Sequence, residues 1–296
     1  MYPPFLQAGS QVGITASARK VSHTELQTTI NWLQLQSYKV IIGNSIGLAH
    51  HQFAGTDEER LNDLQEMLDN PNLDAIWIAR GGYGTARFID QLNYTQFIKY
   101  PKWIAGFSDI TVLLNDIYNK TGIASIHAPM CLHVDTNTIQ SMQSLIDTWS
   151  GKKISFIANY NELNKQGKAN GIVIGGNLSL LCNSIGTKTD IDTTNKLLFL
   201  EDLDEYLYHI DRLMLHLKRA GKLNNLAGLI VGGLTNMKDN EIPFGKTAEQ
   251  IISHYTAEYN YPIAFDMPIG HINDNRAIII GAEMQLLVDK DLVTLS

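Results

Sequence analysis

Strand-like and helix-like segments alternate through the first half of this 296-residue chain. The strand-like segments are short apolar or β-branched runs at residues 11–16, 39–42, 73–79 and 101–105. The helix-like segments repeat apolar residues at helical spacing, at residues 24–36, 56–68, 85–92 and 110–118. A strand, a turn and a helix repeated in this order predict a parallel sheet with helices on both faces.

The alternation weakens between residues 149 and 171, where a polar stretch holds at most one strand, at 154–157. Beyond it the chain is richer in β-forming residues. These runs lie at 172–174, 197–200, 226–231 and 277–280, with one clear helix at 206–220. We therefore predict an α/β domain over residues 1–150, a linker over 151–170 and a mainly β domain over 171–296.

The bulk composition excludes several classes of protein. A net charge of −7 leaves no basic excess for binding phosphate backbones, so we expect no nucleic-acid partner. No apolar run is long enough to cross a bilayer, and residues 1–6 lack the basic start and apolar core of a signal peptide. Cys131 and Cys182 are isolated, as is typical of buried thiols in a reducing compartment. We expect a cytoplasmic protein.

One serine stands at a junction between a predicted strand and a predicted helix. Residues 106–111 (GFSDIT) follow the apolar run at 101–105 and lead into the helix at 110–118. A hydroxyl at such a junction lies near the free N–H groups of the first helical turn, which favour a developing negative charge. Ser108 is therefore a candidate nucleophile. It is also a candidate helix cap, because serine is preferred at helix starts.

A glycine-rich turn, residues 80–84 (RGGYG), follows the strand at 73–79. Glycines there allow a close approach of the backbone to a ligand and leave N–H groups accessible. The spacing matches neither a dinucleotide fingerprint nor a Walker sequence. The turn is either a tight connection or part of an anion or oxyanion pocket, and we expect no nucleotide cofactor.

Two further segments carry groups that can act with a serine. Glu201 ends an apolar run and opens an acidic stretch, residues 201–205 (EDLDE), which is either a solvated loop or the seat of one fixed carboxylate. His271 follows a turn of sequence PIG, and is either a solvated loop histidine or a base. A fixed carboxylate orients a histidine and stabilises its charged form. The histidines show no metal-ligand spacing, so we expect no metal.

These segments together resemble the LD-carboxypeptidases, the serine peptidase family that also contains the microcin C self-immunity peptidase. The resemblance extends over nearly the whole chain. Its segments are residues 80–84 (RGGYG), 102–111 (KWIAGFSDIT), 127–130 (HAPM), 175–178 (GGNL), 186–187 (GT), 200–202 (LED), 208–212 (YHIDR) and 268–271 (PIGH). The chain departs from the family at Ala128, where His-Gly-Pro is frequent, and at Ser10, where an acidic residue is frequent.

The resemblance implies a role for each candidate. Ser108 is then the nucleophile, His271 the general base and Glu201 the acid that orients it. The oxyanion hole is implied to use the N–H of Asp109 and one from the glycine turn, for which we favour Gly82 over Gly81. It also implies an amidotransferase-like α/β N-terminal domain, a smaller mainly β C-terminal domain and a homodimer. Arg80 is a candidate for binding the terminal carboxylate of a substrate, since guanidinium binds carboxylates bidentately.

Three functions follow as hypotheses. The first is a serine carboxypeptidase that removes terminal D-alanine from murein tetrapeptides during peptidoglycan recycling. The second keeps the same residues but cleaves aminoacyl- or peptidyl-nucleotides, which requires an aromatic surface for the base. The four tryptophans lie in strand-like or helix-like segments, where core packing is expected instead. The third is a ligand-binding protein of the same fold without catalysis.

Overall fold

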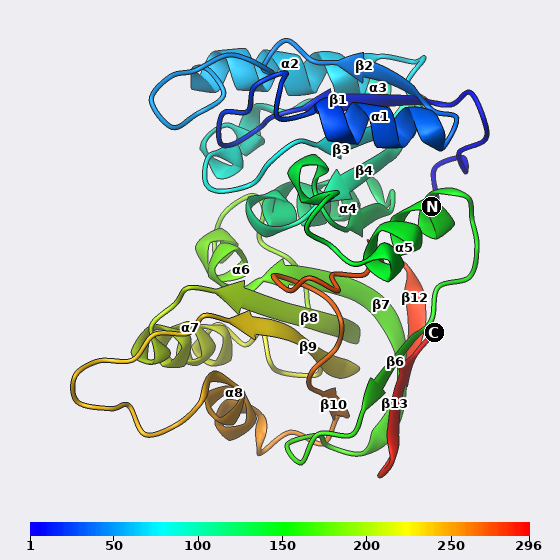
Figure 1. Ribbon diagram of the computed structural model, residues 1–296. Helices are drawn as coiled ribbons and strands as arrows, with labels where there is room; N and C mark the ends of the chain where they lie inside the picture. The colour runs from blue at the N-terminus through cyan, green and yellow to red at the C-terminus, as the bar shows by residue number, and fades with distance from the viewer. The chain divides into compact units, whose positions relative to one another are not determined.

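The computed structural model describes residues 1–296 and divides them into two compact units (Figure 1). The first unit contains residues 1–153 and 273–281, and the second contains residues 154–272 and 282–296. Both units mix helices with a sheet, which confirms the predicted two-domain α/β fold. None of the helices is long and apolar enough to cross a membrane.

The first unit is built on a six-stranded sheet in the order β11-β5-β4-β3-β1-β2. Its strands are β1 (Gln11–Thr15), β2 (Lys39–Ile42), β3 (Ala75–Ile78), β4 (Trp103–Gly106), β5 (Ser125–His127) and β11 (Ile278–Ile280). The first five are mutually parallel, which confirms the predicted parallel sheet and adds β5, a strand that the sequence did not predict. β11 pairs antiparallel with β5. Every residue of β3 and β4 is buried, as expected of central strands in a parallel sheet.

Helices α1 to α4 lie between consecutive strands of this sheet, and α5 follows β5 (Figure 1). They are α1 (Gln27–Leu35), α2 (Asp57–Asp69), α3 (Thr95–Lys99), α4 (Thr111–Thr121) and α5 (Ile139–Trp149). Thr56 and Glu59 form a capping box at the start of α2. Short 3₁₀ turns lie at η1 (Thr85–Arg87), η2 (Ile89–Gln91), η3 (Ser108–Ile110) and η4 (Cys131–His133).

The prediction of a helix at residues 85–92 is wrong, because the structure has the two 3₁₀ turns η1 and η2 there. The buried residue between them, Phe88, has φ −129° and ψ 0°, which is outside the helical region. Tertiary packing of Phe88 therefore overrides the local helical pattern.

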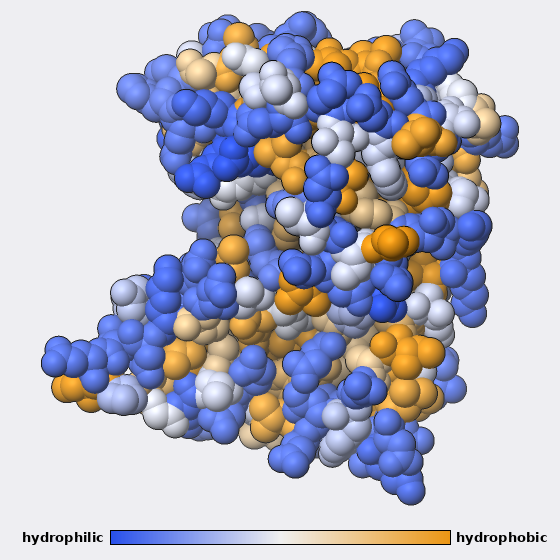
Figure 2. Space-filling view, viewed as in Figure 1, coloured by the Kyte–Doolittle hydropathy of each residue, from blue (hydrophilic) through white to orange (hydrophobic).

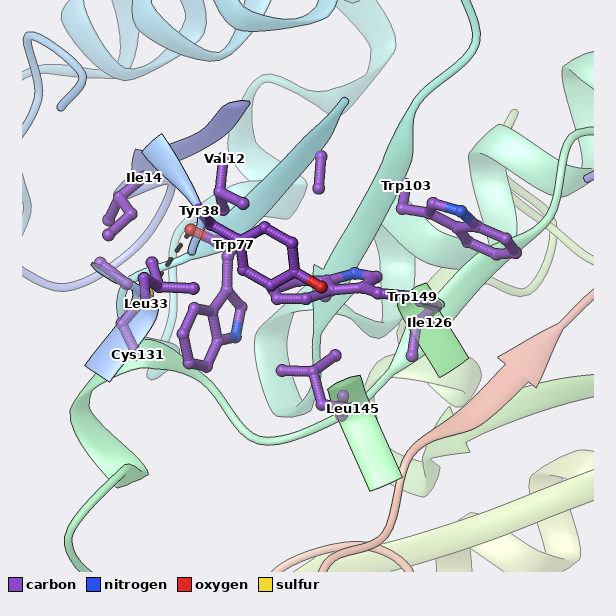
Figure 3. Packing of buried hydrophobic residues seen from close by; sticks show 14 of the residues in the cluster. Val12, Ile14, Leu33, Tyr38, Trp77, Trp103, Ile126, Cys131, Leu145 and Trp149 are labelled. Atoms are coloured by element: carbon purple, nitrogen blue, oxygen red, sulfur yellow. Dashed lines mark hydrogen bonds between the residues drawn. The ribbon is translucent and has the colours of Figure 1, made fainter. Parts of the chain in front are cut away.

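Tryptophans form the centre of the core of the first unit (Figure 3). Trp77 of β3 meets Trp149 of α5 edge to face, with ring centroids 5.7 Å apart. The Trp77 indole N–H donates to the carbonyl of Pro129 at 2.7 Å, which satisfies its buried polar atom. Trp103 of β4 is also fully buried and Trp32 packs on Trp77. The expectation that the tryptophans serve core packing is confirmed.

The second unit has a seven-stranded sheet in the order β10-β9-β8-β7-β12-β13-β6. Its strands are β6 (Phe156–Asn159), β7 (Gly167–Asn177), β8 (Lys196–Leu203), β9 (Gly228–Thr235), β10 (Ile263–Ala264), β12 (Glu283–Val288) and β13 (Leu292–Leu295). β7 to β10 are parallel, and β7, β12, β13 and β6 pair antiparallel. Helix α7 (Leu207–Arg219) packs against both α6 (Leu178–Ser184) and α8 (Ala248–Thr256).

The boundary between the units differs from the expected one in two respects. The expected linker at residues 151–170 contains β6 and the beginning of β7, which pair with β13 and β12. The β-rich run at 277–280, expected in the second domain, supplies β11 of the first sheet instead. Ile278 of β11 lies opposite His127 at the edge of that sheet, where its side chain is buried.

Hydrophilic residues cover much of the face shown in Figure 2, with hydrophobic residues in scattered patches between them.

The two cysteines, Cys131 and Cys182, are buried free thiols. Burial raises the pKa of Cys182 to about 12. Both thiols therefore behave as small core side chains, as the sequence predicts.

Candidate active site

Ser108 is held in a backbone conformation that is unusual for its residue type. β4 ends at Gly106, and η3 begins at Ser108 with φ +62°, in the left-handed region. Such a conformation costs an L-residue about 1–2 kcal/mol and is concentrated at functional turns. No side chain caps the start of η3 or of α4. The hydroxyl of Ser108 is therefore not used as a helix cap, the alternative that local sequence left open.

The glycine turn at residues 80–84 lies against Ser108. A Cβ atom added to Gly81 would lie 3.3 Å from Ser108 Cβ and 3.0 Å from Met130 Cε, so a larger residue would crowd the serine. A Cβ atom added to Gly82 would instead lie 2.4 Å from Arg19 Cδ. The structure thus brings the glycine turn and the serine turn of the first unit into direct contact.

The side chain of Asp109 joins these two turns, a role that sequence reasoning missed. Its carboxylate is buried and accepts hydrogen bonds from the N–H of Thr85 at 2.8 Å and of Gly84 at 3.3 Å. Burial raises the pKa of Asp109, although these hydrogen bonds act in the opposite direction. Sequence reasoning considered only the N–H of Asp109, because nothing local shows where its carboxylate points.

Glu201 and His271 form a pair in the second unit. Glu201 lies near the end of β8 and is fully buried, while the His271 side chain is 13% exposed. Glu201 Oε2 lies 2.5 Å from His271 Nδ1 and accepts the backbone N–H of the same histidine at 3.3 Å. Two bonds to one carboxylate oxygen fix both the imidazole and its loop. Neither residue is therefore in the solvated state that the sequence left open.

The pKa of His271 reflects two opposed effects. Burial lowers it, but the charge of Glu201 and its hydrogen bond outweigh burial and raise the pKa above the usual 6.5. Nδ1 faces Glu201, so the second proton of a charged imidazole is carried by its other nitrogen, Nε2. The pair thus has the electrostatics of a histidine base with an orienting carboxylate.

The rest of the acidic stretch divides between inside and outside. Asp202 is buried and accepts from Asn177 Nδ2 and Ser179 Oγ, each at 2.8 Å. Burial and the neighbouring charge of Glu201 raise the pKa of Asp202 to about 6. Asp204 is exposed, so a solvated loop describes only the later part of this stretch.

The remaining candidate, Arg80, is partly exposed and donates to the carbonyl of Lys20 at 3.4 Å. Ser108, Asp109, the glycine turn and Arg80 belong to the first unit, and Glu201 with His271 to the second. The structure has no group of three or more His, Cys, Asp or Glu side chains arranged to hold a metal ion.

Comparison with known proteins follows the same division of the chain. Residues 12–128 match the family model for the LD-carboxypeptidase N-terminal domain, and residues 170–286 match the model for the C-terminal domain. A probable murein peptide carboxypeptidase of Bacillus subtilis is 34% identical over 286 residues, which is 95% of this chain and 90% of the relative. The chain belongs to the LD-carboxypeptidase family.

Other members of the LD-carboxypeptidase family resemble the chain as well. The crystal structure of muramoyltetrapeptide carboxypeptidase from Oxalobacter formigenes superposes with a TM-score of 0.87 and 26% identity, covering 97% of this chain and 98% of that one. The microcin C7 self-immunity protein MccF of Escherichia coli is 27% identical over 77% of this chain and 76% of its own length. The resemblance seen in the sequence is confirmed.

The left-handed backbone of Ser108 predicts that glycine is a more stable replacement than alanine at this position, the reverse of the order within a helix. Glycine adopts φ +62° without strain, whereas alanine does not, so Ser108→Gly should exceed Ser108→Ala in free energy of unfolding by about 1 kcal/mol. Chemical denaturation measures this difference. Ser144 inside α5 is the control, because there alanine should be the more stable replacement. An alanine variant as stable as the glycine variant at position 108 would contradict the strain.

The Glu201–His271 pair predicts a shift in pH dependence. His271 has a raised pKa, so it loses its proton, and can act as a base, only above the usual 6.5. Glu201→Gln removes the charge that raises the pKa and leaves burial, which lowers it. The histidine titration followed by NMR, and the acid limb of kcat/KM, should both move to lower pH while the maximal rate falls. An unchanged titration of His271 would refute this electrostatic account.

Proposed function

We propose that this member of the LD-carboxypeptidase family is a serine carboxypeptidase that hydrolyses the L,D bond to the terminal D-alanine of murein tetrapeptides. The observation that carries the proposal is the conformation of Ser108. This serine has a left-handed backbone at the end of a central strand, and its hydroxyl does not cap a helix. The relatives named as murein peptide and muramoyltetrapeptide carboxypeptidases support the substrate class. The proposal includes a role in peptidoglycan recycling, a cytoplasmic location and a homodimeric state.

In the proposed reaction, the Ser108 oxygen attacks the carbonyl carbon of the L-centre that precedes D-alanine. His271 Nε2 takes the serine proton and then gives it to the departing amine of D-alanine. The resulting acyl-enzyme is hydrolysed by water, whose proton also passes to His271 before the serine is regenerated. Glu201 holds the imidazole in the required tautomer and stabilises its charged form.

During the attack a negative charge develops on the substrate's carbonyl oxygen. We assign its stabilisation to the N–H groups of Asp109 and Gly82, which would form the oxyanion hole. The carbonyl of Gly81 accepts the N–H of Arg19 at 3.3 Å. In a trans peptide the N–H of Gly82 points the opposite way, away from the Arg19 backbone, which supports Gly82 as the donor. Arg80 is proposed to bind the terminal carboxylate of the substrate through its guanidinium.

A second candidate substrate is an aminoacyl- or peptidyl-nucleotide, suggested by the likeness to the microcin C7 self-immunity protein. Its base requires an exposed aromatic ring for stacking. Trp77, Trp103 and Trp149 are fully buried and cannot supply one, although Tyr83 of the glycine turn is half exposed. The relatives named as murein peptide and muramoyltetrapeptide carboxypeptidases favour the murein peptide. The third candidate, a ligand-binding protein without catalysis, is disfavoured by the close pairing of Glu201 with His271.

One preparation of the protein tested on both substrates decides between the three candidates. Mass spectrometry of a defined murein tetrapeptide should show loss of the terminal D-alanine, and a peptidyl-nucleotide should be turned over far more slowly. Ser108→Ala should abolish release while the circular dichroism spectrum is unchanged, because only the nucleophilic oxygen is removed. Turnover by pure Ser108→Ala would overturn the mechanism. Calorimetric binding of the tetrapeptide without turnover by the wild type would indicate the non-catalytic alternative.

A further inference from the structure

Asp109 touches both sides of the oxyanion site through different atoms. Its backbone N–H is one of the two assigned donors, and its carboxylate holds the turn that carries the other. We propose that the Asp109 carboxylate is a positioning residue that fixes the separation and direction of the two oxyanion donors. The inference rests on the proposed function and assigns a part of the site that the nucleophile, base and acid do not cover.

The bonds of Asp109 lie at one end of the glycine turn, and Ser108 lies at the other. Thr85 and Gly84 donate to the carboxylate, while Gly81 packs against the serine. The hydroxyl of Thr85 is itself 2.8 Å from that of Ser17, which fixes the residue that donates to Asp109. Residues 81–85 are thus attached at both ends to the segment that contains the nucleophile.

A buried arginine supports the same end of the turn from the other side. Arg60 of α2 is fully buried, and a Cβ atom on Gly84 would lie only 2.5 Å from its Nη1. Arg60 donates to the carbonyl of Ser17 at 2.6 Å and pairs with Asp57. Its positive charge acts on Asp109 in the direction that favours the carboxylate form.

The guanidinium is held in place by its surroundings. It lies over the rings of Phe53 and Phe88, 4.8 and 5.3 Å from their centroids. Asp57 is held in turn by Arg87 at 2.8 Å. The end of the glycine turn is therefore fixed between a buried cation and a buried carboxylate, which suits a site whose donors must not move during the reaction.

This arrangement concerns the transition state more than the bound substrate. Donors of an oxyanion site act on charge that exists only during the reaction, so a displaced donor lowers kcat with little effect on KM. In Asp109→Asn, one oxygen can still accept an N–H, but the amide nitrogen cannot accept the other. The turn should then shift while the nucleophile, the base and its orienting acid remain.

The test compares Asp109→Asn with Asp116→Asn. Asp116 is another buried carboxylate of the same region, in α4, bonded to the Tyr94 hydroxyl at 2.7 Å and paired with Lys120. Both variants should lose stability, but only Asp109→Asn should lose kcat on the tetrapeptide, by about 10- to 100-fold with KM within threefold. Asp109→Glu, which keeps the charge but displaces both oxygens, serves as the second variant if the asparagine variant does not fold.

A binding measurement separates positioning from general destabilisation. Affinity for a phosphonate analogue of the tetrahedral intermediate should fall by the same factor as kcat/KM. Affinity for the intact tetrapeptide, measured in a Ser108→Ala background, should not change. Equal loss of both affinities, or a kcat within threefold of the wild type, would overturn the inference.

A second measurement, the rate at which a fluorophosphonate phosphonylates Ser108, does not depend on the proposed substrate. It therefore distinguishes failure of this inference from failure of the proposed function. If the wild type is labelled but does not turn over the tetrapeptide, the substrate proposal fails. The labelling rates still decide whether Asp109→Asn slows attack, because the tetrahedral adduct places an oxygen in the same donor site. Equal labelling rates for wild type and Asp109→Asn would contradict the positioning role.

Discussion

The chain passes from a central strand into a helix through a single residue in a left-handed conformation, Ser108. This conformation is unfavourable for serine in isolation, so the surroundings must impose it. Hydrogen bonds to β3 and β5 hold β4 before the turn, and Asp109 and Ile110 are completely buried after it. The serine is therefore fixed by buried neighbours on both sides, and its hydroxyl does not cap a helix.

The second unit solves a different physical problem, which is to keep a charged group inside the protein. Glu201 is fully buried, and an unpaired carboxylate there would be costly. His271 compensates it with two donors, its backbone N–H and its Nδ1. The same pairing that offsets the burial of Glu201 raises the pKa of His271. The stability of the unit and the proposed basicity of the histidine thus depend on one contact.

Patterns that are local in sequence predicted much of the fold. The parallel strands of the first sheet, the helix at α7 and the core tryptophans follow from periodicity and residue type. The position of β11 could not be predicted in this way, because its pairing with β5 joins residues that are 151 to 155 positions apart. The helix expected at residues 85–92 failed because the packing of Phe88 overrides local propensity.

The candidate site was predictable only in part for the same reason. The Ser108 turn and the segments around Glu201 and His271 were visible as motifs, and the resemblance to the LD-carboxypeptidases linked them. In the sequence, Asp109 is one acidic residue at the start of a predicted helix and Arg60 is one basic residue within another, so neither stands out. Both matter because of their contacts at the end of the glycine turn. The partners of the Asp109 carboxylate, Gly84 and Thr85, are 25 and 24 positions away in the sequence.

Activation of Ser108 by His271 is the step on which the proposed function depends. Its most direct test is the site of covalent labelling by a fluorophosphonate, mapped by tandem mass spectrometry of the digested protein. We expect a single adduct on Ser108 that is lost in His271→Ala, because the base removes the serine proton. An adduct on another serine, or equal labelling of Ser108 in His271→Ala, would contradict it.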